Sequence, residues 1–315
     1  MGLIEDILIR NALAITLDSE NTIHQSADVL ISGGEIIDVG QSIARPPGFT
    51  GRVIDAHGML LIPGLINAHT HSPANHTHGS GDRQSHPAFM WMSQALTSGR
   101  TSREIYVGAM LGAIQMLMSG TTAIIDHFPG QACTSDEINA VMAAHRDSGM
   151  RTALGLRFYD DEFGDILPRG NSFPKDVVAE MQRLNPLRPM PLDEVRAVME
   201  QAINQWDGTE AGRLRIFPAP SNPERCSDEA LVFCRDLAAK HDLGIHTHLL
   251  ESKVQSVIAQ EKYGCTMVEQ LRRLDVLGPR LSCAHTIWVD ENDIDLLADT
   301  GTIVAHNPES NMKIG

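Results

Sequence analysis

Four features that would assign this 315-residue chain to a particular class of protein are absent from its sequence. No Lys/Arg-rich block occurs and the net charge is −15, which argues against nucleic acid or an anionic membrane surface as a partner. No apolar run is long enough to span a bilayer, and no basic segment followed by an apolar core begins the chain, so neither a membrane anchor nor a signal peptide is expected. The five cysteines form no CxxC pair, which favours free buried thiols and a reducing cytoplasm.

What the sequence does contain is histidine at the ends of apolar, strand-like runs. Such runs end at His69-Thr70-His71, His127, His246-Thr247-His248, His285 and His306. Side chains two residues apart in a strand share a face, so each His-x-His pair presents two imidazoles together. Taken alone, the first pair is either half of a metal site or two solvated loop histidines. Five strand ends that carry histidine collectively favour a metal site.

The order of strand-like and helical segments predicts two domains. Residues 1–60 hold only short strand-like runs, including Asp6–Arg10, Ala14–Leu17 and a hairpin around Gly33-Gly34. From residue 61, strand-like runs alternate with amphipathic helices, which predicts βαβ units and a parallel sheet. These runs are Leu60–His71, Thr121–His127, Arg151–Tyr159, Leu214–Pro218, Gly244–Leu250, Leu281–His285 and Gly301–His306. Seven strands without a Gly-rich phosphate loop after the first favour a (β/α) barrel over an open doubly wound sheet.

Helix boundaries follow from capping residues. A capping box at Thr101–Glu104 predicts a helix to about Gly120, and further helices are expected to begin near Ser135, Pro191 and Ser227, the last ending at Gly244. The segments 72–100 and 160–190 are expected to be irregular loops that bind substrate, because barrel enzymes place such insertions after their strands.

The His-x-x-Glu motif at 248–251 adds a candidate proton carrier. A metal-bound water has a lowered pKa, and Glu251 could take its proton and deliver it to a leaving group or ring nitrogen. The alternative is that Glu251 is an acid at the start of the helix that begins near Lys253. His246 and His248 share a face, so spacing leaves open which of them binds metal and which supports it.

Several of these motifs together resemble the amidohydrolase superfamily, in its branch of cytosine, guanine and S-adenosylhomocysteine deaminases and chlorotriazine hydrolases. They are Pro63–His71, Gly120-Thr121-Thr122, His248–Glu251, Ala284-His285 and His306–Lys313. The resemblance covers essentially the whole chain. It implies an α/β fold in which residues 61–315 form a TIM-like (β/α)8 barrel, with seven strands present and the eighth missing. Residues 1–60 would be the N-terminal part of a β-sandwich domain.

The resemblance also implies the chemistry. One divalent metal, zinc with iron as the other candidate, would bind His69, His71 and His248. Glu251 would be the proton shuttle, and His285 would orient the water or polarise the substrate. Two-metal members carry a carboxylated lysine on the fourth strand, but Leu214–Pro220 contains none, so a mononuclear site is expected. The family's Asp on the eighth strand is absent before Gly315, so we expect the sequence to be a fragment.

The expected function is hydrolytic deamination, dechlorination or dealkylamination of a nitrogen heterocycle such as a purine, pyrimidine or triazine. The alternatives are a cyclic amide hydrolase, or a non-catalytic homologue or inactive fragment that lacks the final Asp. A small heterocyclic substrate, a homo-oligomer and a cytoplasmic location are also expected.

Five further residues are candidate contacts to the substrate: Trp91, His127, Arg157, His306 and Asn307. Each has a structural alternative. Trp91 could be ordinary packing, and Arg157 could pair with Asp160 or Asp161. His306 and Asn307 could brace the site by hydrogen bonds, and His127 could equally be structural.

Overall fold

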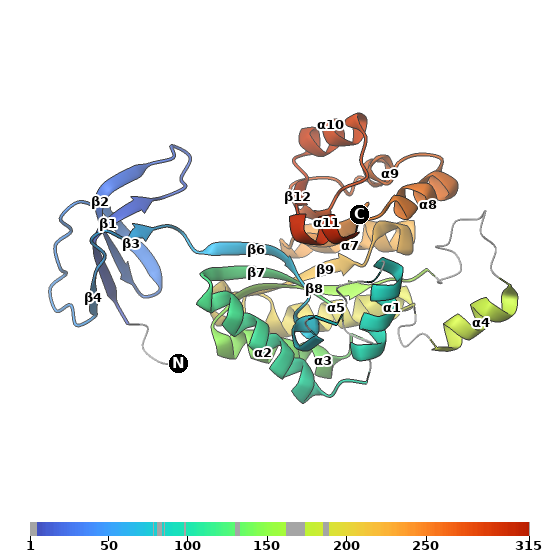
Figure 1. Cartoon of the computed structure of the whole chain (residues 1–315), viewed down its shortest axis with the longest axis horizontal. Coiled ribbons are helices and arrows are strands. Elements are labelled where there is room, and N and C mark those ends of the chain that lie inside the picture. The colour runs from blue at the N-terminus through green and yellow to red at the C-terminus, as the bar shows by residue number, and fades with distance from the viewer. Residues whose placement is uncertain are drawn as a thin grey trace. The chain divides into compact units, whose positions relative to one another are not determined.

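The protein is described by a computed structural model that covers residues 5–314 except 78, 81–83, 85, 98, 130–132, 162–173 and 185–188. It divides into two compact units, Met1–Leu65 and Ile66–Gly315 (Figure 1). In the part of the chain that is described, no helix combines the length and the apolar character needed to cross a bilayer.

The first unit is a five-stranded sheet in the order β3-β2-β1-β4, with β5 also paired to β1. Its strands are β1 (Ile7–Ile15), β2 (Ile23–Ser32), β3 (Glu35–Gly40), β4 (Arg52–Asp55) and β5 (Leu60–Leu61). The predicted hairpin is confirmed, because Gly33 (φ 60) and Gly34 (φ 86) join antiparallel β2 and β3 with the positive φ values that a tight hairpin turn requires. The two short strands predicted before residue 18 are one strand, β1. It continues through Asn11 (φ 62), where its register with β2 shifts.

In the described residues, the second unit contains seven strands that follow one another in chain order. They are β6 (Leu65–Thr70), β7 (Thr121–Phe128), β8 (Arg151–Phe158), β9 (Leu214–Pro220), β10 (Ile245–Leu249), β11 (Leu281–His285) and β12 (Ile303–Ala305). The ladders are β6-β7-β8-β9 and β10-β11-β12. β8 pairs parallel with both β7 and β9, and β11 pairs parallel with both β10 and β12. The two ladders meet where Thr247 Oγ1 donates to the Pro220 carbonyl oxygen (2.8 Å) and the His248 amide donates to that of Ser221 (3.3 Å). Among the described strands, none joins β12 to β6.

Helices connect these strands. They are η1 (Ser72–Thr77), α1 (His86–Thr97), α2 (Ser102–Met118), α3 (Ser135–Ser148), α4 (Lys175–Leu184), α5 (Leu192–Trp206), α6 (Thr209–Gly212), η3 (Pro223–Arg225), α7 (Asp228–His241), α8 (Lys253–Tyr263), α9 (Met267–Arg273), α10 (Glu291–Thr300) and α11 (Pro308–Ile314). The predicted capping box of α2 is confirmed: the Glu104 amide donates to Thr101 Oγ1 (3.3 Å) and the Thr101 amide to Glu104 Oε2 (2.7 Å). Figure 1 shows α2 and α3 side by side along the β6–β8 strands.

Three predicted extents were wrong. Leu60–His71 is not one strand but β5 and β6, separated at Pro63-Gly64, because proline has no N–H to donate to a ladder. The segments 72–100 and 160–190 contain η1, α1 and α4 rather than irregular chain alone. The helix predicted to reach Gly244 ends at His241, where Asp242 (φ 56) takes the left-handed cap conformation.

Alternation along the strands separates an apolar layer from a polar one. Leu154 and Leu156 of β8 are fully buried in the same core cluster as Met142 of α3. Burial of each such side chain stabilises the fold by about 1.5–3 kcal/mol. Arg157, which follows Leu156 on β8, therefore falls on the opposite face of its strand, and His127 of β7 lies on the same side of the sheet. Both side chains are thus on the inner side of the sheet, while helices cover the outer side.

Candidate metal centre

Six histidine rings meet at the carboxyl ends of four strands. They are His69 and His71 from the end of β6, His127 from β7, His246 and His248 from β10, and His285 from β11. The centroid of the His248 ring lies 4.4 Å from that of His127, 4.8 Å from that of His69 and 5.5 Å from that of His285. The predicted ends of β6, β7, β10 and β11 therefore converge, whereas His306, after β12, is exposed and is not among these rings.

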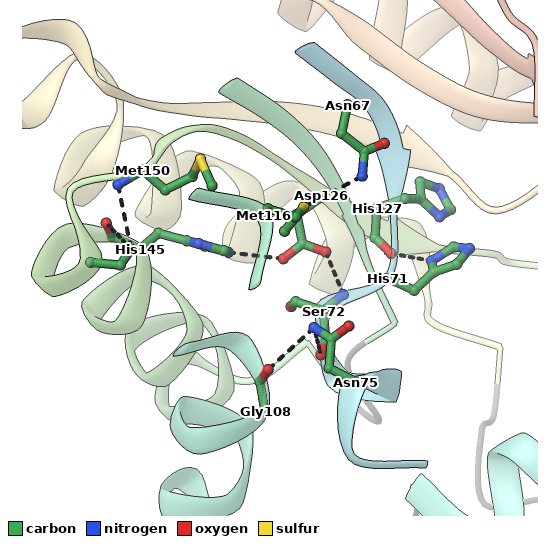
Figure 2. Close-up of polar contacts among 11 residues, drawn as sticks. Asn67, His71, Ser72, Asn75, Gly108, Met116, Asp126, His127, His145 and Met150 are labelled. Atoms are coloured by element: carbon green, nitrogen blue, oxygen red, sulfur yellow. Dashed lines mark hydrogen bonds and ion pairs between the residues drawn. The ribbon is translucent and has the colours of Figure 1, made fainter. Parts of the chain in front are cut away.

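Backbone carbonyls orient two of these rings. Nδ1 of His71 donates to the carbonyl oxygen of His127 at 2.7 Å (Figure 2), and Nδ1 of His248 donates to that of Ser221, also at 2.7 Å. A ring nitrogen that is hydrogen-bonded to a carbonyl oxygen must carry the imidazole proton, because that oxygen can only accept. Nε2 of each neutral ring therefore holds the lone pair. These two Nε2 atoms face each other at 3.3 Å. Two lone pairs at this distance repel unless a cation or a shared proton lies between them.

The spacing of these nitrogens fits a divalent cation. With Zn–N distances of about 2.0–2.1 Å and tetrahedral angles, two ligand nitrogens are separated by about 3.3–3.4 Å. Two triads, His69/His248/His285 and His71/His127/His248, each bring one nitrogen per ring within 4.8 Å of one another. His127 is fully buried, and neither of its ring nitrogens has a hydrogen-bond partner among the described residues. The donor set therefore suits a metal that prefers nitrogen ligands.

Burial keeps these rings in the form that binds metal. Burial lowers the pKa of His69, His127 and His248 well below the ordinary value of 6.5, and nearby imidazoles lower it further. Burial also lowers the pKa of His71, and that of His246 to about 3. Neutral imidazole is the ligand form, so the cluster is prepared for a cation without first losing protons at pH 7.

Glu251 and His285, the two residues predicted to handle protons, lie beside each other. Both side chains are buried, and Glu251 Oε1 lies 3.4 Å from Nε2 of His285. On its other side, His285 Nδ1 donates to Oδ1 of Asn311 at 2.8 Å. Ser252 is the N-cap of α8, so Glu251 precedes the cap. This position leaves its carboxylate with the histidines rather than in the first turn of the helix.

The backbone is strained next to these groups. Leu250, His285 and Thr286 have φ values of 48°, 72° and 51°. Non-glycine residues rarely adopt positive φ, and a β-branched residue such as threonine does so at particular cost. The strain occurs where β10 and β11 end, beside Glu251 and at His285 itself.

Of the five candidate substrate contacts, Arg157 is a buried residue of β8. Arg157 is 7% exposed, and burial lowers its pKa to about 10. The ion pair considered for Arg157, with Asp160 or Asp161, is not found in the described part of the chain. Asp160 instead accepts from the backbone amide (2.8 Å) and the hydroxyl (2.6 Å) of Ser227, and Asp161 pairs with Lys262.

The other tentative contacts lie on α1 and after β12. Trp91 is in α1, and its side chain lies outside the described residues. His306 follows β12, and its Nδ1 lies 3.4 Å from the side-chain Nδ2 of Asn311. The backbone amide of Asn311 donates to the carbonyl oxygen of Asn307 at 2.8 Å. Asn311 was thus missed as a site residue, although it lies within the 306–313 motif.

Comparison with known proteins finds a matching family model and several relatives. A family model described as "Amidohydrolase family" matches residues 60–315. The chain is 29% identical to a 5'-deoxyadenosine deaminase of Methanococcoides burtonii and 32% identical to a 5-methylthioadenosine/S-adenosylhomocysteine deaminase of Desulforamulus reducens, each over 98% of its length. It spans 63% and 64% of the length of these two relatives.

Solved structures show the same fold. The zinc complex of atrazine chlorohydrolase TrzN from Arthrobacter aurescens TC1 matches with a TM-score of 0.82 and 26% identity, over 98% of this chain and 67% of that one. An adenosine deaminase from Xanthomonas campestris with bound zinc matches with a TM-score of 0.79 and 23% identity, over 98% and 64%. These likenesses confirm the predicted α/β barrel class.

Proposed function

The chain belongs to the amidohydrolase family, and from that premise we propose that it is a metal-dependent hydrolase that deaminates a nitrogen heterocycle. The observation that carries the proposal is the pair of Nε2 lone pairs of His71 and His248, which face each other at 3.3 Å. His69, His71 and His248 would hold one zinc ion. A divalent cation held by these rings would lower the pKa of a water molecule and so supply the hydrolytic nucleophile.

His248, rather than His246, is the proposed ligand from β10. His248 takes part in both nitrogen triads, and Ser221 fixes its Nδ1, so its Nε2 is free for a metal. His246 instead places its Nε2 2.8 Å from Nδ1 of His69. A ring that hydrogen-bonds the nitrogen of a ligating histidine that does not bind the metal fixes the orientation of that histidine. We propose this role for His246 toward His69.

Glu251 is the proposed proton carrier. Its carboxylate would accept one proton from the attacking water and deliver it to a ring nitrogen of the heterocycle as the C–O bond forms. The second proton of the water would then pass to the amino group, so that ammonia leaves as the C–N bond breaks and a carbonyl group forms. His285 lies within reach of Glu251 Oε1 and orients the groups around the reacting carbon. Arg157 and His127, both buried on the inner face of the strands, remain the proposed substrate contacts.

The names of the relatives narrow the substrate class. Two are deaminases of 5'-deoxyadenosine or of 5-methylthioadenosine and S-adenosylhomocysteine, which supports an aminopurine nucleoside. The 26% identical structure is an atrazine chlorohydrolase, which supports chloride release from a triazine as the second candidate. Cyclic amide hydrolysis is disfavoured, because it would ordinarily need two metals and β9 offers no lysine.

Three wider predictions stay proposals. Residues 1–60 would belong to a β-sandwich domain and residues 61–315 to the barrel. The assembly would be a homo-oligomer, and the location would be cytoplasmic.

Metal analysis joined to a substrate screen tests the function. The complete protein reconstituted with zinc is expected to hold about one ion per chain and to release ammonia from an aminopurine nucleoside. Glu251→Gln should keep its zinc and lose about 10²–10⁴-fold in kcat, the range typical of general acid–base groups. A chain that binds no metal, or that releases neither ammonia, amine nor chloride across purines, pyrimidines and triazines, would refute the proposal. Two metals per chain would favour the amide hydrolase.

A further inference from the structure

Consecutive residues of β7 clamp consecutive residues after β6. The carbonyl oxygen of His127 accepts the Nδ1–H of His71 at 2.7 Å, and Oδ1 of Asp126 accepts the amide of Ser72 at 3.0 Å (Figure 2). One bond sets the ring of His71, and the other fixes the backbone immediately after it. The direction in which His71 presents Nε2 is therefore determined by two neighbouring positions on β7.

A second residue, from outside the sheet, holds Asp126 in place. Asp126 Oδ2 lies 3.0 Å from Nε2 of His145, on the adjacent helix α3. Both side chains are wholly buried (0% exposed). Oδ1 and Oδ2 of the carboxylate thus have separate partners, one on the chain after His71 and one on α3, as Figure 2 shows. An isolated buried carboxylate is costly, and Asp126 avoids this cost through its contacts to Ser72 and His145.

The turn after His71 is anchored on a further side. Asn75 Nδ2 donates to the Ser72 carbonyl (2.8 Å) and to the Gly108 carbonyl of α2 (3.2 Å). Ser72 is therefore held through both its amide and its carbonyl, by β7 and by α2 respectively. The amide contact is the one that connects it with α3.

We propose that Asp126 and His145 are positioning residues for the cation: they fix the Ser72 amide and so hold His71 Nε2 at the spacing from His248 that a metal requires. The inference rests on the proposed metal site. Neither residue touches the cation or the substrate. Groups that hydrogen-bond a metal ligand directly typically contribute about 10- to 100-fold to metal affinity. Asp126 bonds the residue that follows His71, and His145 bonds Asp126, so this range is the upper limit of their effect.

Four variants separate positioning from general stability. Asp126→Leu removes both contacts, and His145→Leu removes only the one to α3. Asp126→Asn is the conservative variant, because its amide oxygen can still accept from Ser72 and its amide can meet the other tautomer of His145. The matched control is Asp28→Leu. Asp28 is also a buried carboxylate that binds a cationic side chain, Arg10, and a backbone amide, but it lies in the first unit.

The measurements are the zinc dissociation constant, by competition with a chromophoric chelator, and the visible spectrum of the Co²⁺-substituted protein. Asp126→Leu is expected to bind zinc more weakly, by up to about 100-fold, with an altered Co²⁺ spectrum, and His145→Leu by up to about 10-fold. Asp126→Asn should bind within about threefold of the wild type. Asp28→Leu should lose folding stability and keep both the affinity and the spectrum.

Each other outcome overturns the inference. If folded Asp126→Leu binds zinc as the wild type does, the clamp does not position the ligand. If that variant does not fold, His145→Leu decides in the same way. An equal loss of affinity in Asp28→Leu shows that only stability was changed. These failures differ from that of the proposed function, in which the wild type itself would bind no metal.

Discussion

Replacing Asn311 by leucine should impair the proposed chemistry while leaving the metal in place. In the wild type, Nδ1 of His285 must carry a proton, because it donates to Oδ1 of Asn311 at 2.8 Å. Nε2 of a neutral His285 therefore presents a lone pair to Glu251 Oε1, 3.4 Å away. That contact becomes favourable when a proton lies between the two atoms, which is the arrangement a proton carrier passes through.

The loss of Asn311 removes this control of the tautomer. His285 is 4% exposed, so a leucine leaves Nδ1–H without an acceptor, at a cost of about 1–3 kcal/mol. The ring can avoid this cost by moving its proton to Nε2, where it then donates to the oxygen of Glu251 that must receive the proton of the water. If the activation free energy rises by this 1–3 kcal/mol, kcat/KM should fall about 5- to 150-fold below that of the wild type.

Steady-state ammonia release by the zinc-loaded protein measures the effect, with zinc content determined on the same samples. Asn311→Asp retains an acceptor for Nδ1–H and is expected to keep kcat within about threefold. The tautomer can be followed independently by ¹⁵N shifts of the His285 ring. Wild-type kcat/KM in folded, zinc-loaded Asn311→Leu, or an unchanged tautomer, would show that the reasoning is wrong.

Three further predictions concern stability and can be checked by urea unfolding. Burial raises the pKa of Glu224 from 4.5 to about 7, so the folded state holds a proton that the unfolded state releases between these values; stability should fall by about 3 kcal/mol as pH rises from 4.5 to 7, and Glu224→Gln should abolish this loss. Gly112→Ala should destabilise by about 1–3 kcal/mol, since its Cβ would lie 2.0 Å from Asn75 Nδ2, although alanine ordinarily favours a helix; a stability gain would show that the turn at Asn75 yields easily. Leu156→Ala should cost about 2–5 kcal/mol because the side chain is fully buried, and a loss below 1 kcal/mol would mean that the core collapses around the gap.

The sequence was most informative about where the strands end. Period-two alternation places His69 and His71 on one face, and parallel strands bring their carboxyl ends to one edge, so the convergence with His248 and His285 could be predicted. Capping residues likewise predicted the start of α2 at Thr101. These inferences need only local patterns and one rule of architecture.

Contacts that depend on tertiary packing could not be predicted in this way. Arg157 was expected to pair with a near neighbour, but Asp160 is taken by the start of α7 and Asp161 by Lys262. Asp126 and His145 are 19 residues apart, and no spacing rule relates an outward-facing strand residue to one particular histidine on the next helix. Asn311 could have been weighed, since it stood within a motif already singled out. Its partner, His285, became evident only from the fold.

The positive φ of Thr286 bears on how this protein could be improved by laboratory evolution. Glycine adopts such an angle without penalty, so selection for heat resistance alone should favour glycine at this position. Leu250 also has a positive φ, but its side chain is buried in the core, so glycine there would leave a destabilising cavity. Glycine at position 286 would loosen the chain next to His285. A gain in heat tolerance and a loss in turnover are therefore expected to arise from the same substitution, and a screen of this protein would need to score both properties together.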